Sequence, residues 1–362
     1  MQKLTNRIQN YAWGSVTALP ALLGVKPTGV PQAELWLGAH PSAPSMCANG
    51  ETLEALVARD ATRMLGADVA QRFENRLPFL LKVLCAAEPL SLQAHPSLEQ
   101  ARAGFAAENA AGVPLTAAHR NYKDANHKPE IICALTEFRA LCGFRRRGDT
   151  VRFFRALGLD VSVLERDGLS AYFKQLMTER KASLIDTVLN AAPIPEFAAE
   201  QKLAHTLAAK YPGDVGIIGA LLLNLVVLQP GEALYLDAGN LHAYLEGTGI
   251  ELMANSDNVL RGGLTPKHVD VNELLKVLNF TDGPANVLRG EYVTPVPDFR
   301  LSRHVVDGEV KLPAAAQILL VTEGSIHAGA TGLRRGESVF IGADEAVTLT
   351  GRGTVFRAAP GL

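Results

Sequence analysis

Metal-ligating side chains occur in three short segments of the chain. Gln93-Ala-His95 places two of them on one face of a strand, since residues i and i+2 of a strand point the same way. The segments His127-Lys-Pro-Glu130 and Asn240-Leu-His-Ala-Tyr244 add a carboxylate and further imidazoles. Imidazole, carboxylate and amide oxygen are acceptable ligands for a borderline divalent ion such as Zn²⁺. A lone histidine is more often an ordinary hydrogen-bonded residue, so the strand-borne pair carries most of this indication.

A loop from Asn255 to His268 could bind an anion. It carries Asp257, Arg261 and Lys267 around a flexible Gly-Gly pair. Arg and Lys on such a loop suit a phosphate or carboxylate group, and the alternative is a solvated turn with ordinary surface charge. The loop is not a Walker phosphate loop, because no GxxxxGK[ST] occurs in the chain.

Other signatures of chemistry are few. No GxGxxG opens a helix after a strand, and neither GxSxG nor HExxH occurs. Asn10-Tyr-Ala-Trp-Gly14 is aromatic and glycine-rich. Its Trp13 would either stack on a ligand or pack against the edge of a sheet.

Strands are expected to position these segments. Leu77–Ala86 is apolar throughout and predicts a buried strand, and Pro89–His95 alternates as a strand with one polar face does. Ser97 then begins a helix, with Gln100 as its capping-box partner. Glu130 to Leu141 predicts a further strand.

Helices are predicted mainly in one block. Residues 148–212 lose the strand patterns and carry helical ones at 149–157, 169–191 and 196–211. A separate helix is predicted over Glu51–Ala70. The block at 148–212 therefore resembles a helical unit inserted between β segments.

The chain becomes β-rich again after about residue 225, with a weak internal repeat. Gly231–Ala238 resembles Gly336–Ala343, and a Gly-x-Gly follows each copy. Two copies of a short-strand unit suggest a duplicated β-sandwich or jelly roll, although two Gly-Glu turns can also be similar by chance. Where the first copy has His242, the second has Ala346 and Val347, so we expect the chemistry in the first copy.

Composition excludes several classes of protein. The chain has 362 residues, 48% hydrophobic and 20% charged, with a net charge of −2. This is typical of a globular protein of two to three domains and gives no basic excess for binding nucleic acid. The longest apolar run, Val215–Leu228, is too short to span a membrane, so we expect no membrane partner. The four cysteines lack metal spacing and are expected to be reduced and buried in a cytoplasmic protein.

Five motifs, in order, closely resemble the type I mannose-6-phosphate isomerases. They are Tyr11-Ala-Trp-Gly-Ser15, Glu34-Leu-Trp-Leu-Gly-Ala-His-Pro41, Leu90-Ser-Leu-Gln-Ala-His-Pro96, His127-Lys-Pro-Glu130 and Asn255-Ser-Asp-Asn-Val-Leu-Arg-Gly-Gly-Leu-Thr-Pro-Lys-His-Val-Asp270. One such motif is weak, whereas five in order over residues 10 to 270 are highly specific. The tail after about residue 290 carries no diagnostic residue.

The resemblance implies a mainly β fold of cupin-type double jelly-roll β-sandwiches with an inserted α-helical domain. The expected domains are a discontinuous catalytic one (1–147 and 213–290), the helical insertion (148–212) and a cupin-like C-terminal one (291–362). The resemblance further implies one Zn²⁺ per chain and interconversion of mannose 6-phosphate and fructose 6-phosphate through an enediol. The zinc ligands that it implies are Gln93, His95, Glu130 and His242.

The resemblance also implies catalytic roles. Arg261 would stabilise the charge of the enediolate, and His127 and Asp257 are candidates to open the sugar ring. Lys128 and Lys267 could transfer the proton or bind the phosphate. A lysine acting as base would need a lowered pKa.

Other residues are expected to bind the substrate. Lys82 is a further candidate base, because its apolar strand is expected to lower its pKa. Trp13 and Tyr244 would line the sugar pocket or pack structurally, and Glu251 would support the metal or the substrate. Asn255 belongs to the loop motif and is grouped with these residues.

Two other functions fit parts of the pattern. A cupin-type Fe²⁺ oxygenase or another sugar isomerase would use a similar ligand set, and a binding-only cupin would keep the fold without the chemistry. The fourth ligand and the Arg/Lys loop favour zinc and a phosphorylated hexose. No residue pattern marks a dimer face, so a monomer or weak homo-oligomer is expected.

Overall fold

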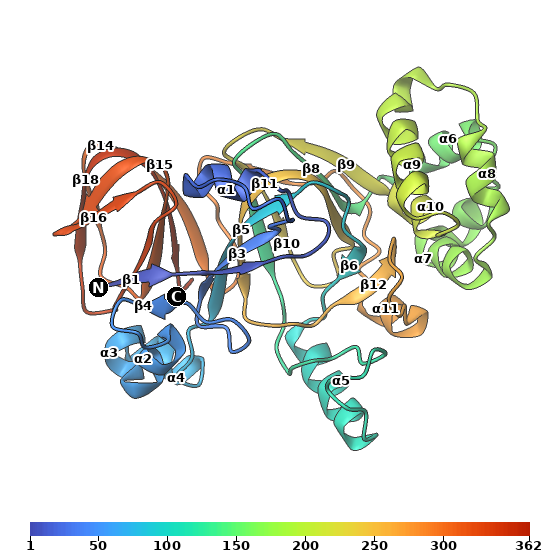
Figure 1. The fold of residues 1–362 in the computed structure, drawn as a ribbon. Coiled ribbons are helices and arrows are strands. Elements are labelled where there is room, and N and C mark those ends of the chain that lie inside the picture. Colours follow the sequence, from blue (N-terminus) through green and yellow to red (C-terminus); the bar gives the residue numbers. More distant parts are fainter.

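A computed structural model describes residues 1–362 as antiparallel sheets with helices at their margins. Figure 1 shows an elongated molecule: a C-terminal sheet lies at one end, a larger sheet in the middle, and a group of helices at the other end. The mainly β prediction is therefore confirmed.

The central sheet is built around one long strand, β11 (His242–Ala254). The first part of β11 pairs with β6 and β8, and the part after Gly247 pairs with β5 and β7. Gly247 has a φ of 126°, and a Cβ there would lie 2.6 Å from the Glu137 carbonyl oxygen, so only glycine fits this change of partners. The other strands of this sheet are β2 (Arg7–Gln9), β3 (Glu34–Gly38), β5 (Phe79–Ala86), β6 (Leu92–Ala94), β7 (Glu130–Ala134), β8 (Phe138–Phe144), β9 (Leu223–Leu228), β10 (Glu232–Leu236), β12 (Leu260–Gly263) and β13 (Val287–Arg289).

The C-terminal sheet includes two strands from the N-terminal part of the chain. β1 pairs with β17 and also with β4, so the first residues of the chain lie in the sheet formed by the last ones. The predicted division into domains stays a prediction, but this pairing ties the two ends of the chain together (Figure 1). The strands are β1 (Gln2–Thr5), β4 (Met46–Cys47), β14 (Arg300–Leu312), β15 (Gln317–Ala328), β16 (Thr331–Arg334), β17 (Ser338–Ile341) and β18 (Val347–Ala359).

The helical block predicted at 148–212 is present, but its boundaries differ. The predicted helix over 169–191 ends at Arg180, whose φ of 47° breaks it. Gly168 also interrupts the helix before it, with a φ of 85°. The helices of this block are α6 (Arg147–Ala156), α7 (Ser162–Glu179), α8 (Ser183–Leu189), the 3-10 helix η1 (Pro195–Phe197), α9 (Ala198–Lys210) and α10 (Gly216–Leu221).

Helices outside this block are short, except α5. The predicted helix over 51–70 is three helices, because Asp60 and Gly66 leave helical geometry. The Ser97–Gln100 capping box is confirmed, since each side chain accepts from the other residue's backbone N–H. These helices are α1 (Ala18–Leu23), α2 (Leu53–Arg59), α3 (Ala61–Leu65), α4 (Ala67–Arg72), α5 (Leu98–Ala110) and α11 (Val271–Val277).

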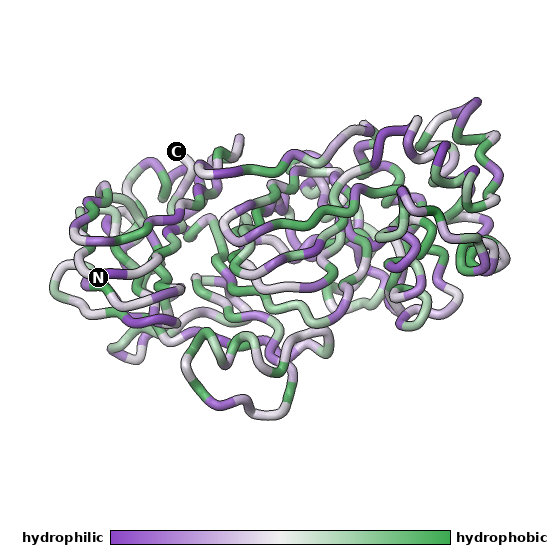
Figure 2. The backbone as a smooth tube through the Cα atoms, turned by 90° about the horizontal axis from the view of Figure 1, so that it is seen from above, coloured by the Kyte–Doolittle hydropathy of each residue, from purple (hydrophilic) through white to green (hydrophobic).

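Several cores hold the molecule together. One cluster joins the helices to the inner face of the central sheet, and another joins the central and C-terminal sheets. Hydrophobic and hydrophilic residues are mixed in all parts of the chain (Figure 2). The run Val215–Leu228 forms α10 and β9 and is mostly buried, and all four cysteines are free and buried, as predicted. No helix has the length and apolar character needed to cross a membrane.

Candidate metal centre and adjoining pocket

Three of the four predicted ligands meet inside the central sheet. His95 follows β6, and Glu130 and His242 begin β7 and β11, so the pairing of these strands brings distant segments together. One oxygen of Glu130 lies 3.4 Å from Nε2 of His95 and 3.4 Å from Nε2 of His242. All three side chains are buried.

The ligand atoms of this cluster have no partner within the protein. Nδ1 of His95 donates to the Asn258 carbonyl at 2.7 Å, and Nδ1 of His242 donates to the Asn240 carbonyl at 2.9 Å. Each ring therefore turns an Nε2 lone pair toward the Glu130 carboxylate. These two nitrogens and one Glu130 oxygen are buried without hydrogen bonds. The donor set fits a divalent cation, which would satisfy all three.

Protonation states in the cluster suit ligation. Burial lowers the pKa of His95 to about 4, and the charge of Lys128 acts in the same direction. Burial tends to raise the pKa of Glu130, but Lys128 and His95 outweigh it and hold the pKa well below its usual range. Neutral imidazole and ionised carboxylate are the forms that bind metals.

The fourth predicted ligand, Gln93, lies in the same row as His242. Arg261, Gln93 and His242 are direct cross-strand partners on β12, β6 and β11. Directly opposed residues in an antiparallel sheet project from the same face. The Gln93 side chain therefore shares the face that carries His242, with Arg261 beside it.

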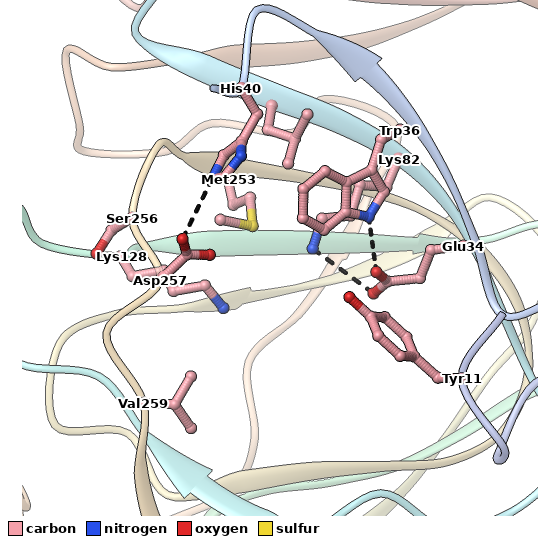
Figure 3. Close-up of a pocket in the computed structure, with 11 residues that line it drawn as sticks. Tyr11, Glu34, Trp36, His40, Lys82, Lys128, Met253, Ser256, Asp257 and Val259 are labelled. Carbon is pink, nitrogen blue, oxygen red and sulfur yellow. Dashed lines mark hydrogen bonds and ion pairs between the residues drawn. The ribbon is translucent and has the colours of Figure 1, made fainter. Parts of the chain in front are cut away.

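A pocket of about 180 Å³ adjoins the cluster (Figure 3). Lys128 connects the two, because it lines the pocket and its ammonium binds the second carboxylate oxygen of Glu130. The lining is mostly polar, as a sugar would require. It comprises Tyr11, Glu34, Trp36, His40, Leu80, Lys82, Lys128, Met253, Ser256, Asp257 and Val259.

Lys82 is the centre of a buried ion network along one wall. Its Nζ lies 2.8 Å from Glu251 and 3.6 Å from Glu34, and 5.3 Å from the ring centre of Trp36. Register explains this, because Trp36, Lys82 and Glu251 are cross-strand partners on β3, β5 and β11. Burial alone would lower the pKa of Lys82, but Glu251 and Glu34 raise it above its ordinary value. The expectation of a lowered pKa is therefore wrong, because it ignored the neighbouring strands.

Asp257 lies at the mouth of the pocket. It is exposed, and its carboxylate lies 3.6 Å from Nε2 of His40 (Figure 3). The interaction with His40 lowers the pKa of Asp257 and outweighs burial, which raises it. Asn255, two residues earlier, donates to the Leu77 carbonyl at 2.6 Å and so fixes the base of the loop.

His127 is held away from the pocket lining. Its Nε2 lies 3.1 Å from both carboxylate oxygens of Asp298, a buried residue just before β14. The structure thus joins the His127-Lys-Pro-Glu130 segment to the start of the C-terminal sheet.

Three cations gather near the Gly-Gly pair of the loop. Burial lowers the pKa of Arg261. Burial and then the charge of Arg261 lower the pKa of Lys267. Lys123, which sequence reasoning missed, has its pKa lowered by burial first and then by Arg120, with Arg261 also contributing.

The two predicted aromatic residues lie in different settings. Tyr244 is buried, and its ring centre lies 6.0 Å from that of His242 and 5.4 Å from that of Phe138. Trp13 is half-buried and stacks on Tyr11, with 5.7 Å between ring centres. Of these residues, Tyr11 lines the pocket.

Sequence reasoning did not single out Tyr11, Glu34, Trp36 or His40 as site residues. A signal existed, because Glu34 and Trp36 are two residues apart on one strand and so share a face. A carboxylate and an indole on one face of a fully buried strand are unusual. Trp36 donates to Glu34 at 2.7 Å across that face.

Together, these features define a β-sheet protein with a buried cluster of side chains suited to a divalent metal ion. A mostly polar pocket lies beside this cluster. A family model described as phosphomannose isomerase type I, catalytic domain, matches residues 1–147. The mannose-6-phosphate isomerase of Salmonella typhimurium is 43% identical over 389 residues, covering 99% of both chains. The human mannose-6-phosphate isomerase is 33% identical, covering 96% of this chain and 94% of the human one.

Solved structures agree with these matches. A mannose 6-phosphate isomerase bound with zinc and yttrium has a TM-score of 0.90 at 41% identity, and the match covers all of both chains. A single-residue variant of the Salmonella typhimurium phosphomannose isomerase has a TM-score of 0.92 at 40% identity, with the same coverage. The chain belongs to the type I mannose-6-phosphate isomerase family, as its motifs indicated.

Proposed function

We propose that this chain is a zinc-dependent enzyme that interconverts mannose 6-phosphate and fructose 6-phosphate through an enediol. The observation that carries the proposal is the cluster of three buried, unpartnered ligand atoms beside a polar pocket, in a chain 43% identical to a mannose-6-phosphate isomerase. A similar protein of known structure is bound with zinc, which supports the choice of metal.

One Zn²⁺ per chain would be held by His95, Glu130 and His242, with Gln93 as fourth ligand from the same face. When bound, the ion would polarise the substrate carbonyl as a Lewis acid. The carbonyls of Asn258 and Asn240 fix the two rings, so the ligands are oriented before the metal arrives.

Ring opening is assigned to Asp257. Its carboxylate lies at the pocket and has a lowered pKa, so at neutral pH it is ionised and can take the proton of the anomeric hydroxyl as the C1 carbonyl forms and the C1–O5 bond breaks. The carboxyl then returns this proton to the ring oxygen, which becomes the C5 hydroxyl. His127 was the other candidate, but Asp298 occupies its Nε2.

Proton transfer between C2 and C1 is assigned to Lys128, which lines the pocket and reaches the metal cluster. Lys82 is the weaker candidate because two carboxylates, Glu251 and Glu34, hold it protonated. The one carboxylate partner of Lys128 is Glu130, a proposed zinc ligand whose charge the bound ion would share. We assign Lys82 and Glu251 to holding the pocket wall that binds the sugar. Trp13 would support that wall through Tyr11, and Tyr244 would pack beneath His242.

Neutralising the negative charge of the substrate is assigned to the cationic side chains of the loop and to Lys123 beside it. Arg261 stabilises the developing enediolate from its place beside Gln93, and Lys267, with Lys123, binds the phosphate. Asn255 holds the loop that carries Arg261 and Lys267.

The wider architecture is proposed on the same basis. The change of partners along β11 and the long antiparallel pairings of β14, β15 and β18 support cupin-type double jelly rolls with a helical insertion. The domain boundaries proposed are 1–147 with 213–290, 148–212, and 291–362. We also propose a cytoplasmic enzyme that is a monomer or weak homo-oligomer.

A coupled assay tests the function. Mannose 6-phosphate is supplied and fructose 6-phosphate is followed, before and after chelation and after zinc is added back, with bound metal measured by elemental analysis. Activity should vanish with the metal and return with zinc. His95→Ala should lose metal and activity together, whereas His205→Ala, an exposed histidine on α9, should keep both. A folded, zinc-loaded protein without activity would refute the reaction and favour another phosphorylated sugar or binding alone.

A further inference from the structure

The C-terminal sheet contains a group of cationic side chains that the proposed reaction does not use. They lie on β14 and β18, at the end of the molecule opposite the helical block (Figure 1). The group consists of Arg300, His304 and Arg357, and the polar residues Ser302 and Gln317 accompany it.

Strand register places this group on the inner face of the sheet. Arg300, Ser302 and His304 alternate along β14, and Ser302 is the cross-strand partner of Arg357 on β18. Directly opposed residues share a face, so all four project the same way. His304 is in turn opposite Val355, which belongs to the hydrophobic core of the C-terminal unit. The cations therefore lie at one end of that core and not on the outside.

Arg357 is the buried member of the group. It is 9% exposed, and its only side-chain hydrogen bond runs from Nε to Oε1 of Gln317 at 2.5 Å. Gln317 is fully buried and is fixed through its own donation to the Pro313 carbonyl at 3.1 Å. The guanidinium is thus oriented by a rigid neighbour, while its two terminal nitrogens have no protein partner.

No carboxylate balances these charges. Burial and then Arg300 lower the pKa of Arg357, and burial and then Arg357 lower the pKa of His304. A buried charge is normally paired, because without a partner it loses solvation that nothing replaces. Here the charges nearest the buried guanidinium are those of other cations.

The side chains of this group differ in how far they are exposed to solvent. Arg300 is exposed, Ser302 and His304 are half-buried, and Arg357 is buried. Nε2 of His304 lies 3.0 Å from the Ser302 hydroxyl, which leaves Nδ1 of the ring without a hydrogen-bond partner. The exposed fraction of the side chains therefore falls from Arg300 to Arg357.

We propose that the cluster of Arg300, His304 and Arg357 binds a small oxyanion of the phosphate class, either inorganic phosphate or a phosphate monoester. The terminal nitrogens of Arg357 would take two of its oxygens in the fork geometry that guanidinium groups favour. Arg300 and His304 would contact the remaining oxygens from the open side. The site lies outside the catalytic pocket, so it would be a second anion site on the chain.

The test uses the full, zinc-loaded chain labelled with ¹⁵N and follows arginine Nε–Hε signals by NMR. The signal that disappears in Arg357→Gln identifies Arg357. On titration with inorganic phosphate this signal should move and saturate, and sodium chloride at the same ionic strength should leave it in place. A parallel titration with mannose 6-phosphate distinguishes the monoester from the free ion.

Variants make the outcome decisive. Arg300→Gln removes an exposed cation and should weaken phosphate binding at Arg357 at least several-fold without unfolding the protein. Arg352→Gln is the matched control, because Arg352 is an exposed β18 residue paired with Asp307 and should leave binding unchanged. An Arg357 signal that does not move with either phosphate compound, or that responds identically in Arg300→Gln and wild type, would overturn the proposal. Since the readout is local to Arg357, it is independent of isomerase activity.

Discussion

Replacing Lys82 by methionine should destabilise the protein strongly at neutral pH. Methionine has a similar length but no charge, so the buried carboxylates of Glu251 and Glu34, 2.8 Å and 3.6 Å from Nζ, would lose their cation. Breaking a buried ion pair by removing one partner costs about 3–5 kcal/mol. An unfolding entropy of about 2.1 cal/mol/K per residue over 362 residues gives about 0.76 kcal/mol/K. The expected fall in Tm is therefore about 4–7 °C.

The fall in Tm caused by Lys82→Met should be larger at neutral pH than at acidic pH. Burial already raises the pKa of Glu251 in the wild type against the opposing charge of Lys82, and removing that charge in Lys82→Met raises it further. Such a group costs stability as pH rises above its unfolded pKa, and the cost is absent below that pKa. The difference in Tm between wild type and variant should therefore be larger at pH 7 than near pH 5.

Calorimetry of the zinc-loaded proteins at both pH values measures this effect. Lys82→Met combined with Glu251→Gln is the matched control, because it also removes the charge of the nearer carboxylate. The double variant should recover more than half of the lost Tm at pH 7. A Lys82→Met protein within about 1 °C of wild type, or a deficit equal at both pH values, would refute the view that Lys82 neutralises this wall.

Other predictions concern separate parts of the molecule. Arg261→Ala should keep its zinc and its fold but lose roughly 10²–10³ in kcat, and normal turnover would contradict its assigned role. Asp298→Asn should leave the zinc content and kcat near wild type and reduce Tm, because His127 lies outside the pocket lining and loses its buried partner carboxylate; a large fall in kcat would instead restore His127 as the ring-opening group. Gly247→Ala should reduce Tm or soluble yield, since its Cβ would meet backbone at 2.6 Å, whereas Gly283→Ala, with nothing within 4 Å, should resemble wild type in the same melting experiment.

The candidate ligands were predictable because their signal is local. A strand with alternating residues places Gln93 and His95 on one face whatever the rest of the chain does. The proline and carboxylate after His127 and the histidine after the Asn240 turn could be recognised as motif residues. Their meeting could not be predicted from periodicity, because it depends on the pairing of β6 and β7 with β11, and pairing between distant strands leaves no local pattern.

The same limit explains the misjudged lysine. Along its own strand Lys82 has only apolar neighbours, and that view predicts a lowered pKa. Across the sheet its neighbours are Trp36 and Glu251, and the charges there reverse the direction. The predicted end of the helix over 169–191 was wrong for a related reason. Arg180 adopts a left-handed backbone conformation that a non-glycine residue does not favour.

The internal repeat has a physical consequence for the two β units. Both copies bury an apolar inner face, but only the first has a histidine after its Gly-Glu strand, so only the first can build the three-atom cluster. In the second unit the group on the inner face consists of the guanidinium groups of Arg300 and Arg357, the His304 imidazole, the Gln317 amide and the Ser302 hydroxyl. A metal cation would be repelled there, because the local charge has the opposite sign. The first unit thus carries the cluster suited to a cation, and the second carries the anion site proposed above.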